Sequence, residues 1–428
     1  MEDETNPKPP PDRRAGLKRF LDHSDLNEDF FDSNMISVQE AKKIIAENVT
    51  QLAPLSLPLQ QAAGLALAKD VYASIDIPAF PQSSMDGYAF SFNDWQQHKK
   101  LKITGEVAAG NNETITLASG NAVRIFTGAA VPPGADTVVM QEKIKAINGE
   151  LVIEDKSIQV GNSVRPKGSE IKAGALALEK NSVLSPAAIG FLAGIGITDV
   201  KIYPNPSVSI ILTGNELQQP GKPLQYGQVY ESNSFALKAV LQQMHINDVE
   251  VFYATDRPEI VTSTLEKALQ QSDVVLLTGG ISVGDYDFVL QAANECGVEK
   301  LFHKVRQRPG KPLYFGKKNN KLVFGLPGNP SSVLTCFYQY VIPALEKLSN
   351  KKTVLQIIQA PLSKPFQKTV VLTYFLKGFY DGKTATPLEA QESYRLSSFA
   401  RANCLIRVNE DVTECRQGDL VEVHLLPF

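Results

Sequence analysis

Between residues 208 and 348, short apolar runs alternate with helical patterns, and this alternation constrains the fold more than any other feature of the chain. The apolar, β-branched runs are typical of strands buried on both faces, and they span residues 208–212, 249–254, 273–277 and 321–324. Helical patterns follow at 234–245, 258–271 and 330–348. Parallel strands need right-handed crossovers, so the pattern predicts a doubly wound α/β domain with a parallel or mostly parallel sheet.

Polar residues and glycines follow each of these strands. They are Gly214, Asn215 and Glu216 after the first strand, Asp256 after the second, Gly279, Gly280, Ser282, Gly284, Asp285 and Asp287 after the third, and Gly328 and Asn329 after the fourth. Ligands of such sheets bind at the carboxyl ends of the strands, so we expect these residues to be neighbours. For the Gly279-Gly280 pair alone, a plain strand-to-helix turn is the alternative interpretation.

The chemistry of these strand ends suits a phosphate ester. Carboxylates bind Mg²⁺ together with phosphate oxygens, while glycine amides and the helix N-terminus after Pro330 bind phosphate. The segment Lys304-Val305-Arg306-Gln307-Arg308-Pro309-Gly310-Lys311-Pro312 adds a basic cluster between prolines. A solvated charge run is the usual reading of such a cluster, but its place before a phosphate-type loop favours an anion site.

Several function classes are excluded by what the sequence lacks. It contains neither G-x-x-x-x-G-K-[ST] nor G-x-G-x-x-G, which argues against P-loop and dinucleotide sites. A formal charge of -3 predicts no general affinity for nucleic acid. The four cysteines are widely spaced, no signal peptide is evident, and the apolar run 183–197 is interrupted and too short for a membrane span. We therefore expect a cytoplasmic protein with no membrane segment.

Outside the doubly wound region, the patterns are less regular. Residues 1–35 are polar and proline-rich, which predicts a mobile tail, and a capping box at Ser37 predicts a helix. Residues 101–153 and 353–428 have the short alternating runs of small β domains, and 183–198 resembles a buried helix. Asp86 precedes a glycine, and the residues alone favour a role in forming a turn over a role as a carboxylate directed at a partner site. Thr127 and Gly128 could form a corner of the small β domain.

Eight motifs, in order, resemble the MoeA family of molybdopterin molybdenumtransferases, whose eukaryotic relatives include gephyrin. They are SMDGYA (84–89), GEVAAG (105–110), RIFTGAAVPPGADTVVMQE (124–142), RPKGSEI (165–171), ILTGNEL (211–217), TGGISVGDYD (278–287), RPGKP (308–312) and LPGNPSS (326–332). The resemblance implies a homodimer whose chain has a tail (1–35), a discontinuous mixed domain (36–72 and 164–204), an inserted β domain (73–163), a MogA-like doubly wound domain (205–350) and a C-terminal β domain (351–428).

The activity that the resemblance implies is Mg²⁺-assisted insertion of molybdate into adenylylated molybdopterin, which yields molybdenum cofactor and AMP. A MogA-type adenylyltransferase would supply the adenylate. The alternatives are that this chain is itself a molybdopterin adenylyltransferase, or that it is a non-catalytic, gephyrin-like scaffold.

Family roles can be transferred to matching positions. The metal ligands would be Glu216, Asp256, Asp285 and Asp287. The catalytic residues would be Asp86, Thr127, Glu216, Asp256 and Asp287, with Asp86 and Thr127 reaching a pocket across the dimer interface. Substrate would contact Gly279, Gly280, Ser282, Gly284, Gly328, Asn329 and Ser331. Molybdate would contact Lys304, Arg308, Lys311, Pro312 and Lys377.

The sequence departs from the family pattern at several of these motifs. Asn215 and Glu231 stand where the family usually has aspartate, and Ser169-Glu170 replaces the usual Glu-Asp pair. Lys377 takes the place of an arginine, and a lysine lacks the bidentate fork that binds an oxyanion.

Overall fold

The computed structural model describes residues 35–111, 115–281, 288–351 and 355–427. The chain divides into two compact units. Unit 1 comprises Met1–Leu52 and Asn205–Phe428, and unit 2 comprises Ala53–Pro204. The predicted positions Ser282, Gly284, Asp285 and Asp287 lie outside the described residues, as do residues 1–34 of the predicted tail.

Unit 1 is built on a six-stranded sheet of order β17-β14-β18-β22-β21-β19. The strands are β17 (Val249–Ala254), β14 (Val208–Thr213), β18 (Val274–Thr278), β22 (Lys321–Leu326), β21 (Tyr314–Lys318) and β19 (Glu299–His303). The first four pair in parallel, and β21 and β19 add antiparallel pairs at one edge. This arrangement confirms the predicted doubly wound, mostly parallel sheet.

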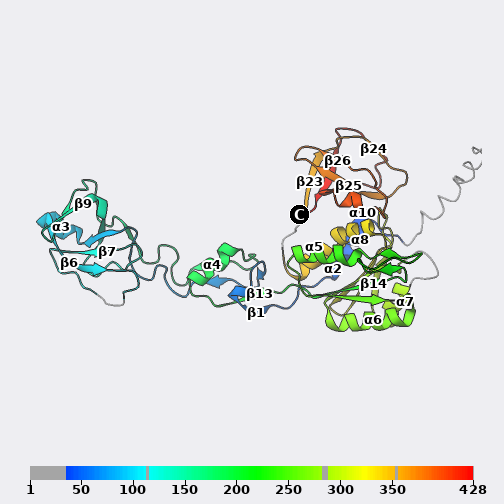
Figure 1. The fold of residues 1–428 in the computed structure, drawn as a ribbon, viewed down its shortest axis with the longest axis horizontal. Coiled ribbons are helices and arrows are strands. Elements are labelled where there is room, and N and C mark those ends of the chain that lie inside the picture. The colour runs from blue at the N-terminus through cyan, green and yellow to red at the C-terminus, as the bar shows by residue number, and fades with distance from the viewer. Residues whose placement is uncertain (1–34, 112–114, 282–287, 352–354, 428) are drawn as a thin grey trace, which may run out of the picture. The chain divides into compact units, whose positions relative to one another are not determined.

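Helices cover both faces of this sheet (Figure 1). On one face lie α2 (Val38–Asn48), α5 (Asn233–Gln243), α8 (Pro330–Cys336) and α9 (Ile342–Leu348); on the other lie α6 (Pro258–Gln271) and α7 (Phe288–Glu295). Successive side chains of β18 pack into hydrophobic cores on opposite faces of the sheet. Val274 and Leu276 pack with the first set, whereas Val275 and Leu277 pack with the second. Such two-sided burial explains why this strand sequence is continuously apolar.

The helix α2 begins at the predicted capping box. The Ser37 hydroxyl accepts a hydrogen bond from the Glu40 amide at 3.1 Å, and the Ser37 amide donates to Glu40 Oε2 at 2.7 Å. Its buried residues Val38, Ala41 and Ile45 belong to the core of unit 1. The apolar face of the helix is matched by the distant helix α9, and the domain boundaries expected for residues 36–72 stay a prediction.

The segment predicted as one helix over 330–348 contains a π-helical stretch. Phe337–Val341 joins α8 to α9 with i→i+5 geometry, and all five of its residues are buried. A π segment carries one extra residue in a turn, so it changes the direction in which the following side chains point.

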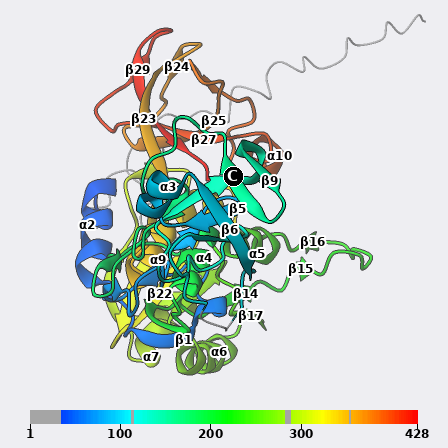
Figure 2. The same ribbon diagram turned by 90° about the vertical axis from the view of Figure 1, so that its left-hand side faces the viewer.

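The C-terminal part of unit 1 is a β domain with its own core. Its sheet has the order β20-β25-β27-β29-β23, with β26 beside β25, and β24 pairs separately with β28. The elements are β20 (Gln307–Arg308), β23 (Gln356–Pro361), β24 (Phe366–Gln367), β25 (Thr373–Tyr380), β26 (Ala385–Pro387), α10 (Leu396–Phe399), β27 (Cys404–Val408), β28 (Glu414–Cys415) and β29 (Leu420–Leu425). In Figure 2, β23 and β29 lie at the opposite end of unit 1 from α6 and α7. The strand β20 attaches the basic segment directly to this sheet.

Unit 2 contains a six-stranded sheet of order β8-β5-β7-β6-β10-β9 and a three-stranded sheet of order β1-β13-β2. Its strands are β1 (Leu55–Pro58), β2 (Ala66–Leu67), β3 (Val71–Tyr72), β4 (Gln82–Ser83), β5 (Gly87–Phe90), β6 (Lys100–Val107), β7 (Asn121–Ile125), β8 (Thr137–Met140), β9 (Ile144–Ile147), β10 (Glu150–Ile153), β11 (Val164–Arg165), β12 (Leu176–Leu178) and β13 (Asp199–Tyr203). Its helices are α3 (Phe92–His98) and α4 (Pro186–Gly194), with 3₁₀ turns at Leu59–Gln61 and Gln141–Lys143.

Two sequence predictions meet different outcomes in unit 2. The small β domain predicted over 101–153 contains the hairpin β9–β10, in which Asn148 and Gly149 both have positive φ and form the turn. The buried helix predicted over 183–198 is wrong in extent and burial. It is limited to α4 by the Ser185 N-cap and by Gly196, and Leu192 is the buried residue within it. Within the described residues, none of the helices is both long and apolar enough to cross a membrane.

Candidate functional site

A cavity of about 660 Å³ opens at the carboxyl ends of the parallel strands of unit 1. The chain visits β14 first, then β17 on one side and β18 on the other, so the direction of winding reverses between β14 and β18. Ligands bind at such switch points in doubly wound sheets. The structure brings together six predicted residues in the cavity wall: Glu216, Asp256, Gly279, Gly280, Gly328 and Asn329.

The Gly279-Gly280 pair is required by the backbone at the end of β18. Both residues have positive φ, at +85° and +63°. A Cβ at Gly279 would lie 2.5 Å from the carbonyl oxygen of Thr213, and one at Gly280 would lie 2.9 Å from Thr213 Oγ1. The absence of side chains therefore lets the ends of β18 and β14 approach closely, which leaves backbone exposed to the cavity.

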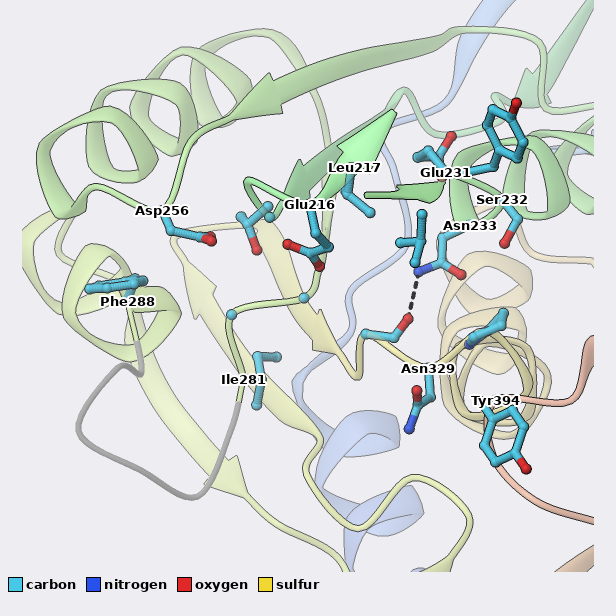
Figure 3. A pocket seen from close by; sticks show the side chains of 18 residues that line it. Glu216, Leu217, Glu231, Ser232, Asn233, Asp256, Ile281, Phe288, Asn329 and Tyr394 are labelled. Atoms are coloured by element: carbon cyan, nitrogen blue, oxygen red, sulfur yellow. Dashed lines mark hydrogen bonds between the residues drawn. The ribbon is translucent and has the colours of Figure 1, made fainter. Parts of the chain in front are cut away.

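Three carboxylates line this cavity, and two of them, Glu216 and Asp256, are predicted site residues. Figure 3 shows the side chains of Glu216 and Asp256 directed toward the same part of it. Asp256 is held by a reciprocal pair of contacts, in which the Asn215 amide donates to Asp256 Oδ2 at 3.2 Å and the Asp256 amide donates to Asn215 Oδ1 at 3.3 Å. Asn215 thus supports the position of Asp256 without adding another negative charge.

The carboxylates fit the expected Mg²⁺ in their chemistry. Magnesium is commonly bound by one or two carboxylates together with substrate phosphates and water, and Glu216 and Asp256 are two carboxylates that would suit such a site. Among the described residues, no group of three or more His, Cys, Asp or Glu side chains is arranged to hold a metal. Asp285 and Asp287 lie outside that part of the chain, so the four-carboxylate site remains a prediction.

The opposite wall includes Asn233 and Tyr394, which sequence reasoning missed, and Glu231, which was noted only as a departure from the family pattern. The Asn233 side chain donates to the carbonyl oxygen of Gly328 at 2.9 Å (Figure 3), which ties the start of α5 to the loop after β22. Glu231 is buried and accepts from the Ser234 amide at 2.6 Å and the Ser234 hydroxyl at 2.7 Å, so its carboxylate caps α5. A Ser-Asn pair before a predicted helix was a usable signal for Asn233. No sequence signal indicated Tyr394, which lines the cavity from the C-terminal part of unit 1.

A second cavity of about 520 Å³ adjoins the first and shares Asn329 and Tyr394 with it. Its wall includes the predicted residues Arg308, Lys311 and Pro312. The Arg308 guanidinium lies 5.5 Å from the centre of the Tyr374 ring, and its Nη1 donates to Thr369 Oγ1 at 3.2 Å. Lys304 lines neither cavity; its backbone amide donates to the Leu313 carbonyl at the base of the same segment.

Lys377, predicted to bind molybdate, has a different environment. Its side chain is 2% exposed, and Nζ donates to the carbonyl oxygens of Ala390 at 2.7 Å, Arg395 at 3.0 Å and Glu392 at 3.2 Å. Burial lowers the pKa of this amine. The ammonium group holds the loop 390–395, whose residues form walls of both cavities, and its contact with molybdate stays a prediction.

Ser331, predicted to contact substrate, is also buried against this loop. Its amide donates to the Ser393 carbonyl at 3.0 Å and its hydroxyl to the Arg395 carbonyl at 2.8 Å. The neighbouring Asn329 donates from Nδ2 to Ser393 Oγ at 2.9 Å. The start of α8 and the loop 390–395 are therefore fastened to each other, and Ser332, the neighbour of Ser331, lines the second cavity.

In unit 2, Asp86 and Thr127 are in direct contact. Asp86 Oδ1 accepts from the Thr127 amide at 2.8 Å and from its hydroxyl at 2.7 Å, and these bonds lower the pKa of the exposed carboxyl group. Gly87, the next residue, lies so close to β8 that a Cβ would stand 1.8 Å from the Val139 carbonyl oxygen. The pair is thus a preformed acidic feature at the start of β5, and its role across a dimer interface stays a prediction.

The chain matches three family models in succession. Residues 36–196 match the MoeA N-terminal region (domain I and II), residues 209–347 match a probable molybdopterin binding domain, and residues 359–426 match the MoeA C-terminal region (domain IV).

Relatives with similar sequences and structures agree with these matches. The molybdopterin molybdenumtransferase of Haemophilus influenzae is 34% identical over 404 residues, which cover 92% of this chain and 99% of that protein. The one of Nostoc sp. is 37% identical over 328 residues, covering 74% and 75% of the two chains. The crystal structure of the molybdopterin biosynthesis moea protein from Pyrococcus horikosii has a TM-score of 0.78 at 31% identity and covers 91% of this chain and 99% of that one. By sequence, order of domains and fold, the chain belongs to the MoeA family, whose curated members are named molybdopterin molybdenumtransferases.

Proposed function

We propose that the protein is a molybdopterin molybdenumtransferase that inserts molybdate into adenylylated molybdopterin and releases AMP. The observation that carries the proposal is the pair of adjoining cavities, one with carboxylates and glycine loops and the other with a basic turn. A substrate with a phosphate-linked nucleotide and a metal-accepting end needs two such environments side by side. The names of the relatives support the same reaction.

The chain's own residues would bind and orient the nucleotide end in the first cavity. Amides near Gly279, Gly280 and Gly328 suit phosphate oxygens, as backbone N–H groups do in other glycine loops. Glu216 and Asp256 would repel a pyrophosphate unless a cation lay between them. Mg²⁺ bound there would neutralise the negative charge that develops as the pyrophosphate link is cleaved.

In the second cavity, Arg308 and Lys311 would attract the molybdate dianion, and the rigid Pro309 and Pro312 would limit the motion of the turn. Asp86 and Thr127 of a second copy would complete the site in a homodimer. We place this chemistry in the cytoplasm, with a MogA-type adenylyltransferase as the source of the adenylate.

The direct test is AMP release from adenylylated molybdopterin with Mg²⁺, measured with and without molybdate, together with the molybdenum content of the pterin product. Asp256→Asn and Glu216→Gln should lower turnover by about 100-fold or more, because loss of several kcal/mol of charge stabilisation has that effect on rate. Glu259→Gln, at an exposed position on α6, is the matched control and should retain activity.

A binding measurement separates the metal role from catalysis. The affinity for AMP should depend on Mg²⁺ in the wild type and lose that dependence in Asp256→Asn. Molybdate-dependent AMP release with metal incorporation establishes the transferase. If the protein binds the substrate but releases no AMP either with or without molybdate, the proposal is contradicted and the non-catalytic scaffold is favoured.

A further inference from the structure

A buried glutamine lies directly beneath the basic turn of residues 308–312. Gln307 is 0% exposed. Its Nε2 donates to the carbonyl oxygens of Gly310 at 3.0 Å and Pro309 at 3.2 Å, and its Oε1 accepts a hydrogen bond from the Tyr340 hydroxyl.

These contacts fix which way the turn presents its amides. A planar trans peptide directs its N–H opposite to its C=O. Because Gln307 holds the carbonyls of Pro309 and Gly310 on one side, the N–H groups of Gly310 and Lys311 point to the other side. Successive N–H groups on one face of a turn form a concave site for an anion.

The underside of the turn is too crowded for the turn to rotate freely. Gly310 has φ +87°, and a Cβ there would lie 2.5 Å from Cys336 Sγ and 2.9 Å from Gln307 Nε2. The Cys336 thiol itself lies 3.4 Å from Gln307 Nε2. The carboxamide therefore sits in a packed space between the turn and α8, with both ends of its hydrogen-bonding group in use.

Tyr340 reaches Gln307 from the π-helical segment Phe337–Val341. The irregular turn matters here because it changes which side chain points toward the basic segment. Burial raises the pKa of Tyr340 well above its ordinary value, which keeps the hydroxyl protonated as a donor. Its bond to Oε1 leaves Nε2, the donor end of the carboxamide, directed at the turn.

We propose that Gln307, oriented by Tyr340, is a positioning residue that shapes the turn 308–312 for a tetrahedral oxyanion. The identity of the oxyanion as molybdate rests on the proposed function. Gln307 makes no contact with the reacting atoms in this scheme; it acts through the backbone of Pro309, Gly310 and Lys311.

The test compares Gln307→Met, which keeps the side-chain length and removes the donor, with Tyr340→Phe, which keeps the ring and removes the hydroxyl. Tyr338→Phe is the control, because Tyr338 is on the same π segment and its ring stacks on Phe399 instead. Sodium molybdate is titrated into each purified full-length protein by calorimetry, and AMP release is measured as a function of molybdate concentration.

Gln307→Met should raise Kd and KM for molybdate by about tenfold or more, by analogy with the loss of groups that orient the ligands of a metal site. Tyr340→Phe should change both in the same direction by less. The kcat at saturating molybdate and the affinity for AMP should stay at wild-type values, as should every parameter of Tyr338→Phe.

Unchanged molybdate dependence in both variants would overturn the proposal, and so would a parallel loss of molybdate affinity, AMP affinity and kcat, which indicates a general structural role. If Gln307→Met fails to fold, Tyr340→Phe decides alone by the same criteria. A wild-type protein that releases no AMP but binds molybdate in a Gln307-dependent way would refute the transferase and leave the positioning role standing.

Discussion

Replacement of Gly279 by alanine tests whether the close approach of β18 to β14 shapes the candidate site. The substitution has two separate costs. A side chain at φ +85° enters the left-handed region, which costs about 1–2 kcal/mol. The new Cβ would also lie 2.5 Å from the Thr213 carbonyl oxygen. This is a backbone atom of a central strand, and forcing such an overlap apart costs about 1–3 kcal/mol.

The expected loss of unfolding free energy for Gly279→Ala is therefore about 2–5 kcal/mol. Gly297→Ala is the matched control within unit 1. Gly297 has φ +70° with open space around the Cβ position, so it bears the first cost alone, about 1–2 kcal/mol.

The assay is urea unfolding followed by far-ultraviolet circular dichroism. Trp95 is the single tryptophan and lies in unit 2, so its fluorescence provides an internal reference for the unit that carries no substitution. The AMP affinity should fall in Gly279→Ala, because the strand ends that line the cavity must separate, and should be retained in Gly297→Ala. Equal destabilisation by the two substitutions would refute the argument from close approach.

Two further predictions concern one buried amine, Lys377, and one half-buried amine, Lys42. Lys377→Met should leave the carbonyls of the loop 390–395 without their buried donor. Amide hydrogen exchange in this loop should then accelerate, while exchange in β14 stays slow. Wild-type protection of the loop in this variant would show that the Lys377 ammonium group does not hold it. Burial, followed by the charge of Arg407, lowers the pKa of Lys42 to about 8 from an ordinary value of 10.5. The unfolded chain binds more protons between these values, so this group makes the protein more stable as the pH rises from about 8 to 10.5. The difference in unfolding free energy between wild type and Lys42→Met should show that rise, and a difference independent of pH would count against it.

The parts of the site that follow buried strands could be predicted from sequence, because their signals are local. An apolar run that ends in glycines and carboxylates indicates both a strand and its functional end, and Glu216, Asp256 and Gly279 all line one cavity. The turn 308–312 was also found, since charges between prolines stand out in the sequence.

The remaining features depend on contacts between distant segments. Ser331 meets Ser393 and Arg395, and nothing near Ser331 in the sequence indicates that partner. The contacts of Lys377 could not be predicted for the same reason. A lysine in a strand carries no local sign of whether its ammonium faces an anion or a ring of backbone carbonyls, and only the packing of the loop 390–395 against α8 decides between them.

The placement of α2 has a consequence for the order in which the protein is made. This helix precedes unit 2 in the chain, yet its apolar face is buried in a core formed by residues that follow unit 2. At ribosomal rates of about 5–20 residues per second, α2 is synthesised on the order of ten seconds or more before its partners. Unit 2, whose contacts are internal, can fold during that interval. We therefore expect the nascent chain to present an unpartnered amphipathic helix until α9 emerges, which makes this segment a natural target for chaperones during translation.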